Sequence, residues 1–199
     1  KQFSRLGVDL SRQTMSNWVL AVADRWLEVI FNSMHEKLLK RDVLHADETT
    51  LQVLREPDRD AQTKSYMWLY RTGRKGLPIV LYEYQPTRAG EHPVKFLTGF
   101  KGYLQVDGYA GYNKVPNIKL VGCLSHIRRK FTDALKALPA DQKNKPVAAK
   151  TGLNFCNNLF SIERKLKGLS DEERYKKRME LSKPLLDDFH AWLKRQYKH

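Results

Sequence analysis

The order of short apolar runs between residues 43 and 138 constrains the fold of this chain more than any other feature. Glycines in residues 72–76 predict a hairpin loop between the second and third of five predicted strands. Helical patterns follow the third and fifth strands, at residues 90–99 and 125–138, and a short helix separates the fourth from the fifth. The runs that predict strands are residues 43–47, 66–71, 78–84, 104–107 and 119–124.

This order is typical of an α/β ribonuclease-H-like fold, a mixed sheet flanked by helices. In that fold the first and fourth strands are neighbours. Asp47 ends the first predicted strand and Asp107 ends the fourth. We therefore expect two carboxylates to lie close together although sixty residues separate them.

Two neighbouring carboxylates supply the hard oxygen ligands that Mg²⁺ prefers, and paired Mg²⁺ ions drive many phosphoryl transfers. The alternative is that Asp47 and Asp107 each cap the turn that follows, which is the commoner role of a single Asp. Their joint placement in this strand order favours the metal site. Glu48 follows Asp47 directly, and successive strand residues face opposite ways, so we do not expect it to be a ligand.

The charge of the chain indicates a polyanionic partner. Its 199 residues carry a formal net charge of +14, and 41% of them are hydrophobic, enough for a core. Residues 1–100 contain 15 basic and 12 acidic side chains, a net +3, whereas residues 101–199 contain 21 and 10, a net +11. A surplus concentrated in one half is typical of a nucleic-acid-binding surface, with general solubility as the alternative.

Cysteine content and hydropathy indicate a reducing, cytoplasmic setting without a membrane. Cys123 and Cys156 form no CxxC pair, so neither a disulfide framework nor a structural zinc site is expected. No apolar stretch approaches the roughly 20 residues of a membrane span, and the start lacks a signal-peptide core. Because the chain begins without Met and ends within a helical pattern, we expect a piece of a longer protein.

Three regions are predicted: a helical segment at 1–41, a catalytic core at 42–140 and a helical insertion at 141–199. In the first region, Ser11 is a plausible N-cap of a helix over residues 13–31. A turn at residues 6–10 precedes it, so this part is either the second half of a helix-turn-helix or an ordinary amphipathic helix. In the former case the side chains facing DNA would be Arg12, Gln13 and Ser16.

Other residues have less specific patterns. Cys123 and His126 have Cys-x-x-His spacing at a strand-to-helix junction, too few ligands for structural zinc, and His126 could instead reach a phosphate. Tyr109 could stack on an unpaired base or simply pack. The cations that could contact phosphates, or else only face solvent, are Arg88, Arg128, Arg129 and Lys130.

Several motifs, in their order along the chain, closely resemble bacterial transposases of the insertion-sequence-66 family, and the resemblance covers essentially the whole chain. These motifs are His45-Ala46-Asp47-Glu48-Thr49, Tyr66-Met67-Trp68, Glu83-Tyr84, Arg88-Ala89-Gly90, Leu104-Gln105-Val106-Asp107-Gly108-Tyr109 and Gly122-Cys123-Leu124-Ser125-His126-Ile127-Arg128-Arg129-Lys130-Phe131.

The resemblance implies a DDE transposase, a polynucleotidyl transferase with a ribonuclease-H-like core. Asp47 would be its first acid and Asp107 its second, and Cys123 with His126 would be the Cys-x-x-His signature of several DDE groups. The implied reaction is Mg²⁺-dependent cleavage at transposon ends, with Mn²⁺ as a substitute, followed by attack of the freed 3′-OH on target DNA. The implied partners are transposon and target DNA at the bacterial nucleoid, a second protomer, and accessory proteins of the element.

The third acid of that family is a Glu in an Asn-Asn-x-Ala-Glu-Arg type motif beyond the helical insertion. Residues 157–164 end in Glu163-Arg164 and are superficially similar, but residues 162–170 match the insertion instead. The resemblance therefore puts the third acid beyond residue 199, and this chain alone should be almost inactive. Alternatives are a non-catalytic DNA-binding remnant, a ribonuclease-H-like nuclease, and a structural module whose acids cap turns.

Overall fold

The computed structural model describes residues 2–139 and 147–197. The chain folds into two compact units, one ending at Gly122 and the other beginning at Cys123. The predicted boundary between residues 140 and 141 falls outside the described residues. Each unit is described by itself below.

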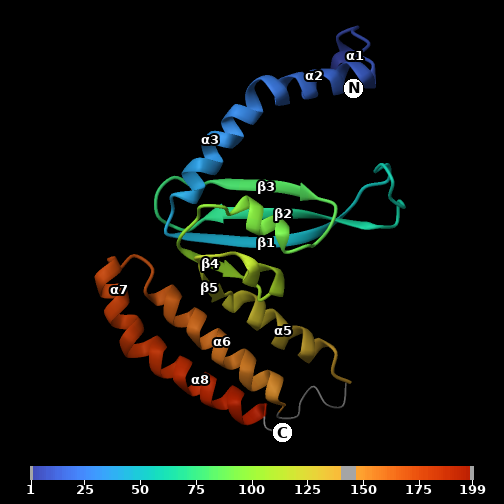
Figure 1. Cartoon of the computed structure of the whole chain (residues 1–199). Helices are drawn as coiled ribbons and strands as arrows, with labels where there is room; N and C mark the ends of the chain where they lie inside the picture. The colour runs from blue at the N-terminus through green and yellow to red at the C-terminus, as the bar shows by residue number, and fades with distance from the viewer. Residues whose placement is uncertain (1, 140–146, 198–199) are drawn as a thin grey trace. The chain divides into compact units, whose positions relative to one another are not determined.

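The first unit is built on a five-stranded mixed sheet of order β3-β2-β1-β4-β5. The antiparallel half contains β1 (Val43–Gln52), β2 (Lys64–Thr72) and β3 (Val80–Gln85). The parallel half adds β4 (Tyr103–Val106) and β5 (Lys119–Gly122) to the other edge of β1 (Figure 1). This confirms the predicted α/β ribonuclease-H-like architecture, including the adjacency of the first and fourth strands.

One expectation about the first strand was wrong, because Asp47 does not end it. β1 continues to Gln52, and its last residues pair with β2 as far as Gln52 opposite Lys64. The polar residues after Asp47 suggest a turn, yet Thr49 and Thr50 are β-branched and suit an extended ribbon. The parallel pairing with β4 does stop early, at His45 opposite Gln105, so Asp47 lies beyond the end of that ladder.

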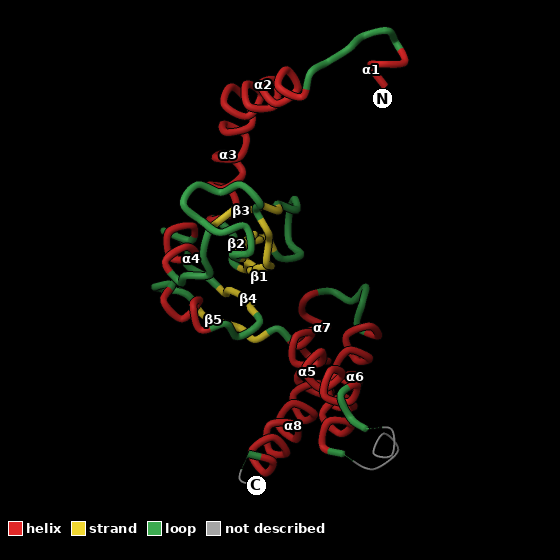
Figure 2. The backbone as a smooth tube through the Cα atoms, turned by 90° about the vertical axis from the view of Figure 1, so that its right-hand side faces the viewer, coloured by secondary structure: helices red, strands yellow, loops and turns green. Residues whose placement is uncertain are grey.

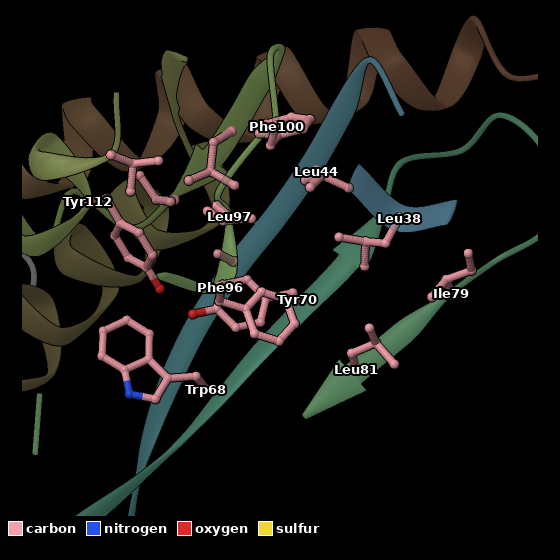
Figure 3. Close-up of a cluster of buried hydrophobic side chains, with 14 residues drawn as sticks. Leu38, Leu44, Trp68, Tyr70, Ile79, Leu81, Phe96, Leu97, Phe100 and Tyr112 are labelled. Atoms are coloured by element: carbon pink, nitrogen blue, oxygen red, sulfur yellow. The ribbon is translucent and has the colours of Figure 1, made fainter. Parts of the chain in front are cut away.

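The core of this unit covers one face of the sheet (Figure 3). Trp68 and Tyr70 from β2 are fully buried, and the Tyr70 ring stacks on Phe96 with centroids 3.8 Å apart. Phe96 ends α4 (Glu91–Phe96), and both Phe96 and Leu97 are buried, as predicted for the short helix at residues 90–99. Each buried aromatic removes about 150–250 Å² from water, roughly 4–6 kcal/mol at 25 cal/mol per Å². The short 3-10 helix η2 (Ala110–Lys114) adds the fully buried Tyr112.

The N-terminal segment is helical but contributes little to this core. After α1 (Gln2–Arg5), helix runs without a break through α2 (Arg12–Val22), the π-helical η1 (Ala23–Leu27) and α3 (Glu28–Leu39). Ser11 caps α2 by accepting a hydrogen bond from the Thr14 amide, which confirms the predicted N-cap. Leu38 alone among the residues of these four elements is fully buried. The apolar residues that recur at three- and four-residue spacing in this segment are exposed: Met15, Trp18, Val19, Val22, Trp26 and Ile30.

The second unit is a bundle of helices (Figure 2). It contains α5 (Leu124–Lys136), α6 (Ala148–Lys165), α7 (Asp171–Lys177), the π-helical η4 (Arg178–Ser182) and α8 (Lys183–Gln196). Ser170 and Glu173 form a capping box at the start of α7. Within the described residues, no helix is long and apolar enough to cross a membrane. The bundle packs around an aromatic cluster of Phe131, Phe155, Phe189 and Trp192.

Glu83 on β3 makes the stability of the first unit sensitive to pH. It pairs with Trp68 in the sheet register, and burial raises the pKa of its carboxyl above the usual 4.5. Because the folded state holds this proton more tightly, the unfolding free energy should fall as pH rises from 4.5 through the raised pKa. We expect Glu83→Gln to be more stable than the native chain at neutral pH and to lose that advantage in acid. Urea unfolding across pH measures this.

Glu91→Gln is the matched control, because a hydrogen bond from Lys114 lowers the pKa of Glu91. Its effect on the pH dependence should have the opposite sign. If the difference in unfolding free energy between Glu83→Gln and the native chain does not change with pH, the buried carboxyl does not have the role assigned to it.

Candidate active site

The register between β1 and β4 has an offset of sixty residues. Each paired residue of β1 faces the β4 residue sixty positions later, from Val43 opposite Tyr103 to His45 opposite Gln105. Asp47 lies two residues beyond the last pair, and Asp107 is the first residue after β4. Neighbouring strands lie about 4.8 Å apart. If the offset continues for two residues, the two predicted acids lie level with each other.

Both aspartates also lie on the same face of the sheet by strand alternation. Leu44 and Ala46 are buried in the core, so Asp47 lies on the opposite face of β1. Leu104 and Val106 are buried in the same core, and alternation assigns Asp107 to the opposite face as well. This face carries exposed side chains such as Tyr82 rather than the packed core. Asp47 is partly exposed and Asp107 is exposed.

Local hydrogen bonds orient each carboxylate. Asp47 Oδ1 accepts from the Glu48 amide at 3.0 Å, and Asp107 Oδ1 accepts from the Tyr109 amide at 2.8 Å. The second bond closes an Asx turn around Gly108, whose φ of 97° is left-handed and favours glycine. The turn-capping alternative is thus compatible with the structure at Asp107, and it does not compete with a ligand role.

The donor set fits Mg²⁺. Two carboxylates are a common protein contribution to a Mg²⁺ site, with water and substrate phosphates completing the octahedron. Among the residues that the structure describes, no group of three or more His, Cys, Asp or Glu side chains could hold a metal ion. A depression of about 150 Å³ lies beside Asp47, but its other lining residues come from β1, β2 and β3 rather than β4. It is therefore not the space between the two aspartates.

Arg88 and Tyr109, predicted to contact DNA or support the site, form part of the protein's own framework. The Arg88 guanidinium pairs with Glu48 and lies over the Tyr109 ring, with Cζ 3.9 Å from the centroid. The Tyr109 hydroxyl donates to the Arg88 carbonyl. Arg12, Gln13 and Ser16, the other predicted DNA contacts of this unit, are all exposed on α2.

The remaining predicted residues lie in the second unit. Cys123 is the N-cap residue of α5 and a free thiol, and His126 lies in the first turn of that helix. Arg128 Nε donates to Asn157 Oδ1 on α6 at 2.7 Å, so this side chain helps to join two helices. Outward-facing cations on α5 include Arg129 and Lys130, both exposed.

Glu163, the weak candidate for the third acid, forms a bidentate ion pair with Arg178. Its two carboxylate oxygens accept from Arg178 Nε and Nη2 at 2.6 and 2.7 Å, which links α6 to η4. This arrangement is the common fork-to-fork geometry of structural Arg–carboxylate pairs. It gives Glu163 a structural role within the second unit.

The sequence patterns did not reveal the partners of Glu48. The Glu48 side chain is 2% exposed, and Tyr112 Oη donates to its Oε2 at 2.6 Å. The alternation of side chains along a strand predicted only that Glu48 and Asp47 lie on opposite faces of the sheet, as they do. One signal was available in the sequence. Strand alternation assigns Glu48 to the core face, and a buried carboxylate needs hydrogen-bonding or charged partners.

The sequence profile of the transposase IS66 family matches residues 1–199. The chain belongs to this family. The uncharacterized protein y4hP of Sinorhizobium fredii is 33% identical over 213 aligned residues, and the alignment covers 98% of this chain and 38% of that protein. The uncharacterized protein y4qI of the same organism is 29% identical, with 96% and 37% covered. This chain thus spans well under half the length of these relatives.

A solved structure, the cryoEM structure of simian T-cell lymphotropic virus intasome in complex with PP2A regulatory subunit B56 gamma, contains a matching chain. The match has 12% identity and a TM-score of 0.33, and it covers 67% of this chain and 52% of that one. A score of this size is too low to establish a shared fold. The family assignment therefore depends on the profile match.

The ion pair of Glu163 with Arg178 predicts that replacing Glu163 lowers the stability of the protein and leaves its metal affinity unchanged. Glu163→Gln removes one charge from a pair whose side chains are 36% and 47% exposed. We expect it to cost up to about 1 kcal/mol of unfolding free energy, the upper end for exposed pairs. We expect Mn²⁺ affinity to stay at the native value. Thermal unfolding and calorimetric titration check the two parts, and a fall in Mn²⁺ affinity would restore Glu163 as a ligand.

Proposed function

We propose that this IS66-family chain carries two of the three catalytic acids of a DNA transposase, Asp47 and Asp107, and that they bind Mg²⁺. The third acid would come from a part of the longer protein that follows this sequence. The whole protein would cleave DNA at transposon ends and join the freed 3′-OH to target DNA. The observation that supports this proposal is the sixty-residue register between β1 and β4, which would set the two acids level if it continued two residues past its last pair.

The side chains have distinct roles in this proposal. Asp47 is fixed by its position in the ladder between β1 and β2, opposite Leu69, while Asp107 is fixed by the Asx turn that follows β4. Their short side chains leave little freedom to the oxygens, which favours ligands whose position must be defined. Bound Mg²⁺ would activate the attacking oxygen and stabilise the leaving oxygen of the phosphodiester.

The charge distribution supports DNA as the substrate. From Cys123 to the end, the chain has 18 basic and 9 acidic residues, a net +9 of the total +14. Arg129 and Lys130 on α5 are exposed cations of this unit. Contacts of this kind give sequence-independent affinity and hold DNA on the protein without reading its bases.

Titration calorimetry with Mn²⁺ tests the metal site. We expect Asp47→Asn and Asp107→Asn each to weaken binding by more than tenfold, since even outer-shell substitutions cost about 10–100-fold. Asn has the same shape as Asp and still offers a hydrogen-bond acceptor, so both variants should keep the native fold. Asp133→Asn, an exposed aspartate on α5, is the control and should bind like the native chain.

Equal affinity in the native chain and both variants would contradict the proposal. Absence of binding that persists in a longer chain, extended by the part of the protein that follows this sequence, would contradict it as well. Circular dichroism spectra of the three variants show whether any loss reflects unfolding.

The salt dependence of DNA binding tests the basic surface. Each phosphate contact contributes about 0.9 to the slope of log K against log salt. We expect the double variant Arg129→Gln/Lys130→Gln to lower that slope by about 1–2, measured by anisotropy of a labelled duplex. Lys177→Gln/Lys183→Gln removes equal charge from lysines already paired with Glu180 and Asp187 and should change the slope less. Equal slopes in both double variants would show that the effect is bulk charge alone.

A further inference from the structure

Glu48 is a buried charge next to Asp47. Its side chain is 2% exposed and lies on the core face of β1, where register pairs it with Trp68. A carboxylate taken out of water costs several kcal/mol unless it is paired and fully hydrogen-bonded. Burial of the Glu48 carboxylate is therefore unfavourable by itself, and the partners of this carboxylate indicate what it contributes.

Both carboxylate oxygens are satisfied, by residues from two different segments. Arg88 donates to Oε1 through Nε at 2.8 Å and through Nη2, and Tyr112 donates to Oε2 at 2.6 Å. Tyr112 is fully buried, and burial together with the Glu48 hydrogen bond raises the pKa of its hydroxyl. Tyr112 thus keeps its proton and remains a donor.

The same partners lead to the turn that holds Asp107. The Arg88 carbonyl accepts from the Tyr109 hydroxyl, and the Arg88 guanidinium lies on the Tyr109 ring. The Tyr109 amide in turn donates to Asp107 Oδ1 at 2.8 Å. A chain of contacts therefore runs from Glu48, the neighbour of Asp47, through Arg88 to the Asp107 carboxylate.

The backbone alone does not provide this link. Pairing between β1 and β4 ends at His45 opposite Gln105, two residues before the aspartates. The turn after β4 contains Gly108 in a left-handed conformation, and glycine is the residue least restrained by its own sterics. Val106, the residue before Asp107, is paired with Gly122 of β5 rather than with β1. Beyond His45, the side-chain contacts of Glu48 and Arg88 are therefore a direct connection between β1 and the Asp107 turn.

We propose that Glu48 is a positioning residue that locks the Asp107 turn to β1 through Arg88, Tyr109 and Tyr112. Its consequence for metal binding rests on the proposed function, because it assumes that Asp47 and Asp107 share a metal. The lock itself is independent of any metal. It is a property of the first unit, since all of these residues lie before Gly122.

Amide hydrogen exchange of the whole chain, read by NMR at Tyr109, tests the lock directly. In the native chain the Tyr109 amide is bonded to Asp107 Oδ1. With Glu48→Gln, which weakens the Arg88 pair, we expect this amide to exchange at least about tenfold faster, as for loss of a charge-assisted bond. Tyr112→Phe removes one hydroxyl only and should give a smaller acceleration, about two- to tenfold.

The chain contains a matched control in Glu56. Its carboxylate accepts from Arg59, Ser65 and Tyr84, so it has the same kinds of partner as Glu48 but lies in the loop between β1 and β2. Glu56→Gln should lower thermal stability without accelerating exchange at Tyr109. If the control accelerates it equally, or if Glu48→Gln leaves it unchanged, the lock does not exist.

Mn²⁺ titration of the same variants separates this inference from the proposed function. We expect Glu48→Gln to bind Mn²⁺ about tenfold or more weakly, the usual cost of an outer-shell change, and Glu56→Gln to bind normally. Native affinity in Glu48→Gln, alongside weak binding by Asp47→Asn, would overturn the positioning role and leave the metal site intact. If the native chain and Asp47→Asn both fail to bind, and a longer chain that continues beyond this sequence fails as well, the metal site fails, and exchange at Tyr109 still decides the lock.

Discussion

The central strand β1 is the constraint on which the first unit depends. It pairs with β2 in an antiparallel ladder along nearly its whole length and with β4 in a parallel ladder over three residues only. Because side chains alternate, these two registers together decide which residues enter the core and which lie on the opposite face. A shift of β1 by one residue against its neighbours would move Asp47 into the core and expose Leu44.

Much of this arrangement could be predicted from the sequence. The apolar runs predicted the five strands, and their order, typical of a ribonuclease-H-like fold, correctly predicted that the first and fourth are neighbours. A shared site of Asp47 and Asp107 stays a prediction. The length of β1 could not be predicted, because Thr49 and Thr50 become strand only through pairing with β2. Nor could the partners of Glu48, since Arg88 and Tyr112 lie 40 and 64 residues away and no local pattern links them.

In the N-terminal helices, the spacing of apolar residues predicted the secondary structure but not the burial of the apolar side chains. Apolar residues at three- and four-residue spacing correctly predicted a helix, and Ser11 correctly predicted its start. The same pattern normally also predicts burial, yet Trp18 and Trp26 are 53% and 57% exposed. Periodicity reports the conformation that a sequence favours when its apolar side is covered, and it does not specify the segment that covers it.

Two carboxylate clusters in the same unit illustrate what a buried charge can contribute. Hydrophobic replacements of buried ion pairs are often as stable or more stable, so stability alone does not explain such groups. The Glu56 cluster joins the β1–β2 loop to β2 and β3, all within the antiparallel half of the sheet. The Glu48 cluster instead joins β1 to the segments on either side of β4. Asp47 belongs to the first half and Asp107 to the second, so a directional contact between the halves defines their separation in a way that an apolar contact would not.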